Sequence, residues 1–167
     1  MALIALGINH DTASVDVREK VAFAPEQMSE ALRSVCDVAE LEEAVILSTC
    51  NRTEVLAYSQ ADKSEEIIAL LSRFHDIAED VLRNNIYCYM DEEAILHMMQ
   101  VASGLDSMIL GEPQIFGQLK SAYAVAVESG TVSTELSQAM QHTFNYAKRV
   151  RTETAIGQNP VSVAYAA

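Results

Sequence analysis

The sequence of 167 residues has few basic residues, with 11 lysines and arginines against 24 acids and a formal net charge of −13. Nucleic-acid affinity normally rests on lysine and arginine contacts to phosphate, so this balance argues against a broad phosphate-binding surface. The basic residues Lys148, Arg149 and Arg151 do cluster near the C-terminus. A nucleic acid would therefore have to be held at this local patch or by another domain.

Cysteines are few as well. Cys36, Cys50 and Cys88 are an odd number without C-x-x-C spacing, which argues against a disulfide framework and a zinc site. No apolar stretch approaches the roughly 18 residues of a membrane helix. The first residues lack a basic segment ahead of their apolar run and lack a cleavage site, so they predict a strand rather than a signal peptide. We therefore expect a cytoplasmic protein with no bound metal and no membrane contact.

The order of the expected elements predicts an α+β fold. Strands are expected at residues 3–8, 44–48, 55–58 and 85–90, and helices at 23–40 and 63–75. This order is that of a ferredoxin-like βαββαβ unit, an antiparallel sheet backed by two helices. Residues 1–157 are expected to form one domain, with the sheet part at about 1–90 and a helical part at about 91–157. Residues 158–167 are expected to begin a linker.

Three helices are expected in the second part, at 91–104, 111–130 and 133–157. In the first of them, helical spacing places Ile95, Met98, Met99 and Ala102 on one apolar face. The last helix is expected to be capped at its N-terminus by the side chain of Ser133 or of Thr134.

The stretch "ILSTCNRTEVLAY" at residues 46–58 places Cys50 between two expected strands. Cysteine usually behaves as a small buried hydrophobe, and Cys36 and Cys88 fit that interpretation. Cys50 instead has small and polar neighbours, at a strand end that would hold a side chain rigidly. We interpret it as a candidate nucleophile, and the alternative is a β-turn that happens to contain a cysteine.

A nucleophile normally needs a group that manages protons. His10 follows the first strand, and His97 lies on an apolar flank of a helix, where a core residue is the ordinary interpretation. Sequence pattern alone does not choose between them. His75 ends a helix and is expected to be solvated.

Spacing sets two cysteine chemistries aside. A cysteine phosphatase loop places its arginine six positions after the cysteine, with glycines between, whereas Arg52 lies at plus two. Papain-like proteases surround their cysteine with glycine and an aromatic residue, and both are missing here. No G-x-G-x-x-G follows a strand, so the chain is expected to carry no dinucleotide fold of its own.

Arg52 would suit a substrate carboxylate, because bidentate pairing fixes orientation as well as charge. The alternative is a surface arginine paired to Glu54. The segment "ASGLDSMILGEPQIFGQ" at 102–118 is rich in small and polar residues. It is either a loop that caps two helices or the wall of a polar pocket.

Four segments occur in the same order as signatures of one family: "GINHDTASVDVREKVAF", "LSTCNRTE", "ASGLDSMILGEPQI" and "AKRVRTETAIG". On these residues the chain resembles the N-terminal catalytic domain of the glutamyl-tRNA reductase family, over nearly its whole length. The resemblance implies the first step of five-carbon tetrapyrrole (porphyrin, heme) biosynthesis. In it a cysteine attacks the ester of glutamyl-tRNA, and NADPH reduces the resulting thioester to glutamate-1-semialdehyde.

The resemblance also implies roles for individual residues. The nucleophile matches Cys50, and an activity-linked histidine matches His97. Eight further positions match substrate-binding residues of the family: Thr49, Asn51, Arg52, Ser107, Glu112, Pro113, Gln114 and Gln118. Among these, Arg52 would hold the substrate's carboxylate and Glu112 would suit its ammonium.

Family members continue into an NADPH-binding domain and a helical dimerisation domain. The resemblance therefore implies that this chain forms the thioester but binds no NADPH, and that the family homodimer depends on a C-terminal domain beyond residue 167. The implied partners are glutamyl-tRNA(Glu) and, as a further candidate, glutamate-1-semialdehyde aminomutase. Two other functions remain open, a thiol esterase and a non-catalytic ferredoxin-like binding domain.

Overall fold

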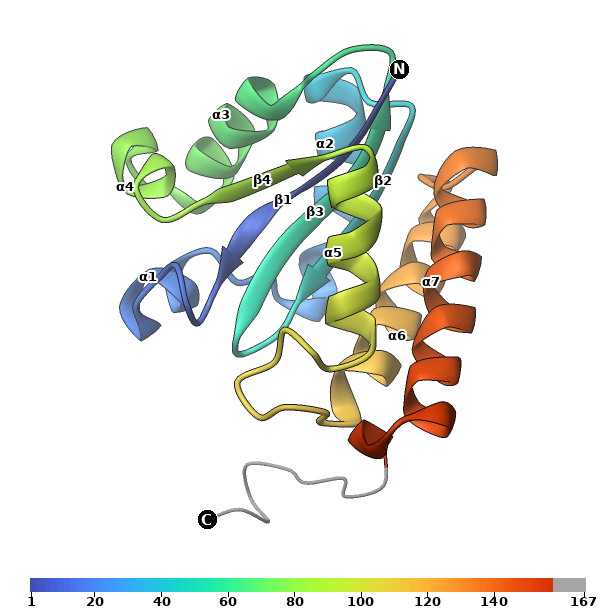
Figure 1. Cartoon of the computed structure of the whole chain (residues 1–167). Coiled ribbons are helices and arrows are strands. Elements are labelled where there is room, and N and C mark those ends of the chain that lie inside the picture. The colour runs from blue at the N-terminus through green and yellow to red at the C-terminus, as the bar shows by residue number, and fades with distance from the viewer. Residues whose placement is uncertain (158–167) are drawn as a thin grey trace.

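The computed structural model describes residues 1–157, and the expected linker at 158–167 lies outside them. Within the described residues the strands and helices follow one another as shown in Figure 1: β1 (Ala2–Asn9), α1 (Val15–Lys20), η1 (Pro25–Gln27), α2 (Met28–Ala39), β2 (Glu43–Ser48), β3 (Arg52–Ser59), α3 (Ser64–His75), α4 (Glu79–Arg83), β4 (Tyr87–Met90), α5 (Glu92–Ala102), α6 (Gln114–Ser129), α7 (Thr134–Glu153) and η2 (Ala155–Gly157). None of the described helices is long and apolar enough to span a bilayer.

The strands form one sheet in the order β2-β3-β1-β4, with every neighbouring pair antiparallel. The expected antiparallel sheet is thus confirmed. β3 begins at Arg52, three residues before the predicted strand, because its first residues pair with Asn9 of β1 and Ser48 of β2. Gly7 of β1 lies opposite Glu54, and a Cβ there would stand 2.3 Å from the carbonyl oxygen of Thr53. The sheet is therefore closely packed where the candidate site begins.

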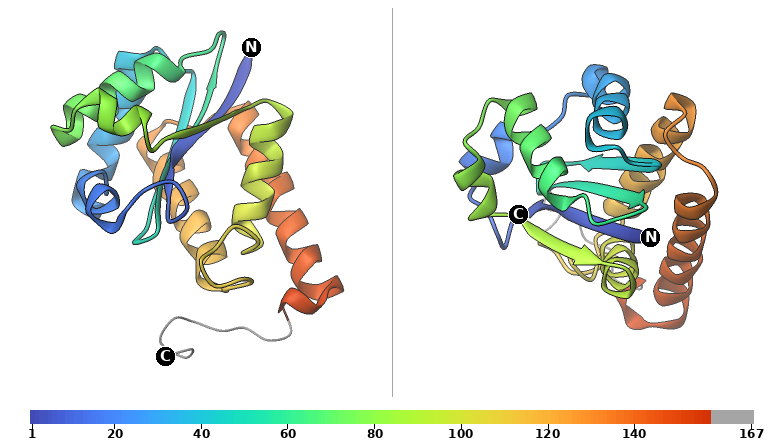
Figure 2. Two further views of the ribbon diagram at one scale, coloured as in Figure 1. Left: turned by 60° about the vertical axis from the view of Figure 1, so that its left-hand side comes forward. Right: turned by 90° about the horizontal axis from the view of Figure 1, so that it is seen from above.

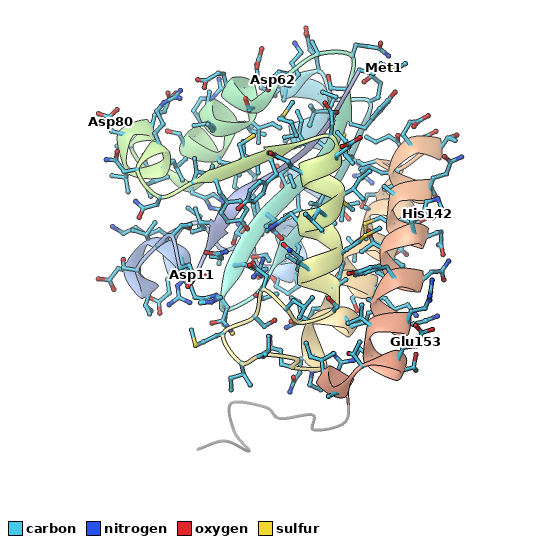
Figure 3. All side chains as sticks on the ribbon, in the orientation of Figure 1. Met1, Asp11, Asp62, Asp80, His142 and Glu153 are labelled. Carbon is cyan, nitrogen blue, oxygen red and sulfur yellow. The ribbon has the colours of Figure 1, made fainter. Side chains whose placement is uncertain are left out.

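Helices cover both faces of the sheet. Figure 2 shows α2 and α3 on one side and α5, α6 and α7 on the other. The strands β1, β2 and β3 are buried along most of their length, as expected for a sheet covered on both faces. Acidic side chains lie on the outside, among them Asp62, Asp80 and Glu153 (Figure 3). The negative charge of the chain is therefore largely a property of its solvated surface.

The buried face of α5 differs from the predicted one. Met98 and Ala102 are buried as expected, but Ile95 is 36% exposed, and His97 takes part in the buried face. The helix packs its His97 side against β1 and β4, where the imidazole stacks on Tyr89 of β4 with ring centroids 4.7 Å apart. The imidazole also contacts the buried carboxylate of Glu54 on β3. This polar contact outweighs the apolar periodicity of the helix.

The start of α7 also differs from the prediction. Ser133 is the N-cap residue, but its side chain makes no capping hydrogen bond. The buried carboxylate of Glu43 on β2 accepts instead, from the backbone N–H groups of Ser133 (2.5 Å), Glu135 (3.1 Å) and Leu136 (3.1 Å). A carboxylate at a helix N-terminus satisfies free N–H groups and complements the helix dipole. Glu43 therefore fastens α7 to one end of the sheet.

Candidate functional site

Cys50 lies in the tight turn between β2 and β3, at the end of the sheet opposite Glu43. Thr49 builds this turn. Its N–H donates to the carbonyl oxygen of Arg52 at 2.8 Å, and its Oγ1 accepts from the N–H groups of Asn51 and Arg52, both at 3.2 Å. Cys50 is free and exposed, whereas Thr49 and Asn51 are half-buried. The turn thus presents a thiol to solvent on a backbone that hydrogen bonds hold in place.

Arg18 contacts the same turn, although the sequence analysis did not predict it as a site residue. Its Nη1 donates to Oδ1 of Asn51 at 3.2 Å. Arg18 lies on α1, which begins at the N-cap Ser14 and has only six residues, too few to show an apolar period. The Asp-Val-Arg stretch after a capping serine is the only sequence signal for this helix. A second cation therefore stands behind the Cys50 turn.

Arg52 is not the surface arginine of the alternative interpretation, because it is only 2% exposed. Its Nη2 donates to the backbone oxygen of Asp106 at 2.7 Å and to Oδ2 of the same residue at 2.8 Å. Its Nη1 stands 3.5 Å from Oε2 of Glu54. Burial lowers the pKa of Arg52, but the charge of Glu54 and the bond to Asp106 outweigh it and raise the pKa above its ordinary value.

Glu54 is the centre of this buried cluster. Its Oε1 accepts from the Tyr87 hydroxyl at 2.5 Å and is paired with Nε2 of His97. Burial raises the pKa of Glu54, but its contacts with His97, Arg52 and Tyr87 outweigh that effect and hold the pKa below 4.5. Burial next to this carboxylate raises the pKa of Tyr87 well above 10. We call these five side chains, Arg52, Glu54, Tyr87, His97 and Asp106, the buried charge cluster.

The histidines of the chain have different surroundings. His97 reaches Arg52 through Glu54, and among residues 1–157 no hydrogen bond joins either His97 or His10 to Cys50. The structure therefore links His97 to the site through the buried charge cluster and not through the thiol. The expectation that His75 is solvated is wrong. His75 is half-buried with its ring 4.5 Å from that of Phe23, and burial lowers its pKa.

The loop between α5 and α6 brings the predicted helical half of the site to this end of the sheet. Asp106 contacts Arg52 directly, and Ser107 and Glu112 are half-buried on the same loop. Pro113 is the N-cap residue of α6, and Gln114 and Gln118 follow on its exposed face. Both glutamines line a cavity of about 620 Å³ together with Ser48, the residue before the Cys50 turn. The volume is in the usual range of small-molecule pockets, roughly 300–1,000 Å³.

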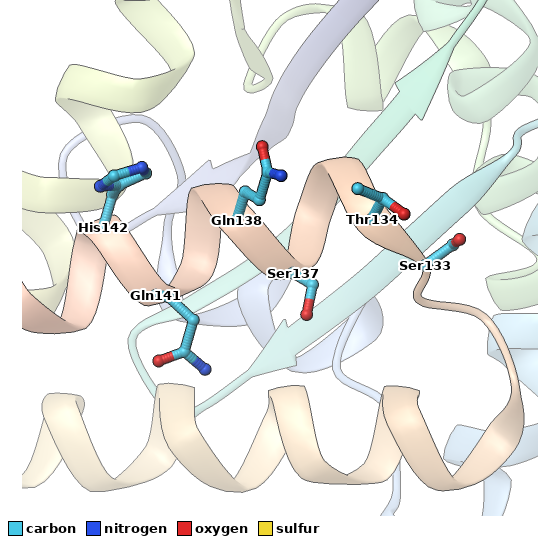
Figure 4. Close-up of a pocket in the computed structure, with 6 residues that line it drawn as sticks. All are labelled: Ser133, Thr134, Ser137, Gln138, Gln141 and His142. Atoms are coloured by element: carbon cyan, nitrogen blue, oxygen red, sulfur yellow. The ribbon is translucent and has the colours of Figure 1, made fainter.

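A second cavity of about 470 Å³ lies along α7, as shown in Figure 4. It is lined by small polar side chains and His142, and it lies at the Glu43 end of β2 rather than at the Cys50 end. Its lining residues include no cysteine and one titratable group. The chemistry of the chain is therefore better sought between β2 and α6.

The basic cluster near the C-terminus does not act as one patch. Arg151 donates from Nη2 to the backbone oxygen of Gly111 at 3.1 Å and from Nη1 to that of Ser103 at 3.4 Å. Arg149 pairs with Glu153 at 3.3 Å, and Lys148 is exposed. Arg151 thus braces the loop that carries Asp106. Within residues 1–157 no group of three or more His, Cys, Asp or Glu side chains is placed to hold a metal ion.

Comparison with known proteins gives concordant results. The family model described as "Glutamyl-tRNAGlu reductase, N-terminal domain" matches residues 6–154. Curated glutamyl-tRNA reductases from Stutzerimonas stutzeri and Pseudomonas aeruginosa are 58% and 59% identical over all 167 residues. The chain spans about 40% of the length of these relatives. The solved structure titled "Glutamyl-tRNA Reductase from Methanopyrus kandleri" is similar with a TM-score of 0.81 and 34% identity, over 96% of this chain and 37% of that one.

Proposed function

The chain belongs to the family of glutamyl-tRNA reductase N-terminal domains, and from that premise we propose that it performs the acyl-transfer half of a glutamyl-tRNA reductase reaction. The observation that carries the proposal is the exposed thiol of Cys50 on an ordered turn, two residues from a buried, charge-paired arginine. Exposure alone does not single out this thiol, because Cys88 is exposed as well, and the expectation that Cys88 is a buried hydrophobe is wrong. Cys50 lies on a turn that hydrogen bonds hold in place, two residues after Ser48, which lines the cavity between β2 and α6.

The proposed step is attack of the Cys50 thiolate on the ester carbonyl of glutamyl-tRNA. A carbon–sulfur bond forms, the carbon–oxygen bond to the terminal ribose breaks, and the ribose hydroxyl leaves with a proton from solvent. The thiol proton passes to solvent before the attack, since Cys50 is exposed. The product is a glutamyl thioester, which accepts hydride more readily than an oxygen ester does.

We assign the recognition of the glutamyl group to both halves of the site. Arg52 takes its side-chain carboxylate, and Glu112 takes its ammonium group. The remaining assigned positions, Thr49, Asn51, Ser107, Pro113, Gln114 and Gln118, supply hydrogen bonds and shape. His97 acts as a positioning residue, because its contact with Glu54 holds the carboxylate that faces Arg52.

NADPH does not fit the residues at hand. A dinucleotide fold binds pyrophosphate at a glycine-rich turn between a parallel strand and a helix. The described sheet is antiparallel throughout, and the sequence has no G-x-G-x-x-G. We therefore derive no hydride transfer from this chain, and we assign that step to residues outside it.

The strand order β2-β3-β1-β4 with antiparallel neighbours supports our assignment of the sheet to the ferredoxin-like arrangement. Three free cysteines support a reducing cytoplasm as the location. The family homodimer and the aminomutase partner stay predictions, as does the place of the reaction in tetrapyrrole synthesis.

Release of tRNA from glutamyl-tRNA tests the proposed function against its two alternatives. We expect a burst of one tRNA released for each protein molecule, followed by little turnover, because the thioester is not reduced. A thiol esterase would instead release tRNA continuously, and a binding domain would give no burst. Cys50→Ser should abolish the burst, whereas Cys88→Ser, which changes another exposed cysteine, should not.

A further inference from the structure

The proposed partner of the substrate carboxylate is already occupied. The Arg52 guanidinium is 2% exposed, and a carboxylate of the chain itself, that of Asp106, stands 2.8 Å from its Nη2. The backbone oxygen of the same residue is 2.7 Å away. A substrate carboxylate cannot reach Arg52 unless this cover moves. The Nη1 of Arg52 is also buried without a hydrogen-bond partner, so the guanidinium has donor capacity left.

The segment that covers Arg52 is built as a loop with a fixed neck. The N–H of Gly111 donates to the backbone oxygen of Gly104 at 2.9 Å, and both glycines have positive φ angles, 78° and 82°. A Cβ on Gly104 would stand 2.9 Å from the Cα of Gly111, so the two ends touch. Compact loops with adjoining ends are a recurrent unit of protein surfaces. We call residues 104–111 the Asp106 loop.

The adjoining ends of the Asp106 loop, Gly104 and Gly111, form its neck, and residues 105–110 between them form its tip. The neck and the tip are held by different contacts. Arg151 donates to the backbone oxygens of Ser103 and Gly111, which fixes the neck to α7. The tip exposes three large apolar side chains, Leu105, Met108 and Leu110. Within the described residues, the side-chain hydrogen bonds of the tip are those of Asp106, to Arg52 and to Nδ2 of Asn9 at 3.4 Å. Asp106 therefore ties the tip to the sheet, through its carboxylate and through its backbone oxygen.

We infer that Asp106 is a gate on the substrate site: its carboxylate occupies Arg52 in the free protein and gives way to the side-chain carboxylate of the glutamyl ester. The inference rests on the proposed role of Arg52. Exchange of one carboxylate for another leaves the charge around Arg52 the same in the free and the ester-bound protein, and Glu54 still faces the guanidinium at 3.5 Å while the tip is open. The neck contacts with Arg151 remain intact while the tip swings away.

The gate reduces apparent affinity, because the ester binds only the fraction of molecules in which the tip is open. Asp106→Asn keeps the shape of the side chain but replaces a charge-assisted bond with a weaker neutral one. If about one molecule in ten is open in the natural sequence, the variant should lower the half-saturating concentration of ester about tenfold. Asp106→Ser, which removes the carboxylate and shortens the side chain, should act in the same direction.

The experiment measures the rate of Cys50 acylation by glutamyl ethyl ester, as the mass of the intact 167-residue chain against ester concentration. Asp11→Asn is the matched control, since it removes one acid that is 74% exposed and bonds through its N–H to the same Asn9. We expect the control to leave half-saturation unchanged. A rise in half-saturation for both Asp106 variants would overturn the gate and leave Asp106 as a support for Arg52.

A variant pair separates this inference from the proposed function. In an Arg52→Gln background, Asp106→Asn should have no further effect, and an effect that persists there would overturn the gate. Arg52→Gln alone should abolish the preference for the glutamyl ester over glutaminyl ethyl ester, whose carboxamide is neutral. A preserved preference would contradict the role of Arg52, and with it the gate. If neither ester acylates the natural chain, the proposed function itself is contradicted.

Discussion

The substitution Glu54→Gln tests how much the buried charge cluster contributes to the stability of the fold. The natural carboxylate is 1% exposed and is bonded to His97 and Tyr87 while it faces Arg52. The glutamine keeps the shape but removes the charge. Arg52 would keep its bonds to Asp106, so the substitution removes one of two carboxylates around a buried guanidinium.

Breaking a buried ion pair from one side costs about 3–5 kcal/mol, and the retained Asp106 places this case at about 3 kcal/mol. For a domain of this size that loss lowers the melting temperature by about 6–12 °C. The matched control is Glu65→Gln, because Glu65 also pairs with an arginine, Arg83, at 2.6 Å but is 68% exposed. The control should change stability far less, since solvent screens exposed pairs.

The effect should also depend on pH with a definite sign. The pKa of Glu54 in the folded protein lies below 4.5, its ordinary value, so the folded state favours the ionised form. The stabilisation is fully present above pH 4.5 and is lost as the pH falls through the lower folded value. Urea denaturation at neutral and acidic pH measures this difference. Equal losses in Glu54→Gln and Glu65→Gln, or a difference between natural and variant chains that grows in acid, would refute the reasoning.

Other predictions concern packing, capping and thiol reactivity. Glu43→Gln should lower the free energy of unfolding by about 1–3 kcal/mol, measured by urea denaturation, because three N–H groups of α7 lose a charged acceptor. Gly7→Ala should cost about 2–3 kcal/mol, because its Cβ would overlap the β3 backbone. Gly117→Ala, which meets nothing within 4 Å inside α6, should instead gain about 0.5–1 kcal/mol by the same measurement. Burial, with help from nearby acids, raises the pKa of Cys36 to about 11, so iodoacetamide at about pH 8 should label Cys36 last of the three cysteines, and early labelling would contradict its burial.

Apolar patterning predicts the sheet and the long helices well. The α7 stripe of Leu136, Met140, Phe144 and Ala147 is buried as its spacing indicates, and Gly130 ends α6 in the left-handed conformation. The same reasoning misses α1 and α4, because five or six residues hold too few turns to show a period. Local pattern therefore predicts long helices well and misses helices of five or six residues.

The site is predictable only in part, for a comparable reason. The unusual polarity around Cys50 marks the turn, and the turn is where the sequence places it. The partners of Arg52 come from positions far apart in the chain, since Asp106 is 54 residues away and His97 is 43 residues from Glu54. No local spacing encodes such contacts. On an apolar helix flank His97 has the pattern of an ordinary core residue, and only the fold brings it against the carboxylate of Glu54.

The capping of α7 illustrates the same limit. Ser133 has the residue type and the position of a capping residue, and the sequence predicts that either Ser133 or Thr134 caps the helix. The structure supplies Glu43 from a strand 90 residues earlier, whose carboxylate accepts from several N–H groups at once. Here a tertiary contact from a buried charge replaces the local cap.

The central claim is that Cys50 takes the glutamyl group from glutamyl-tRNA, and the most direct measurement is the mass of the acid-quenched protein followed by peptide mapping. The account predicts one glutamyl group on the peptide that contains Cys50, formed without NADPH and absent from Cys50→Ser. A glutamyl group on Cys88, or one that persists in Cys50→Ser, would contradict the account, as would an unmodified chain.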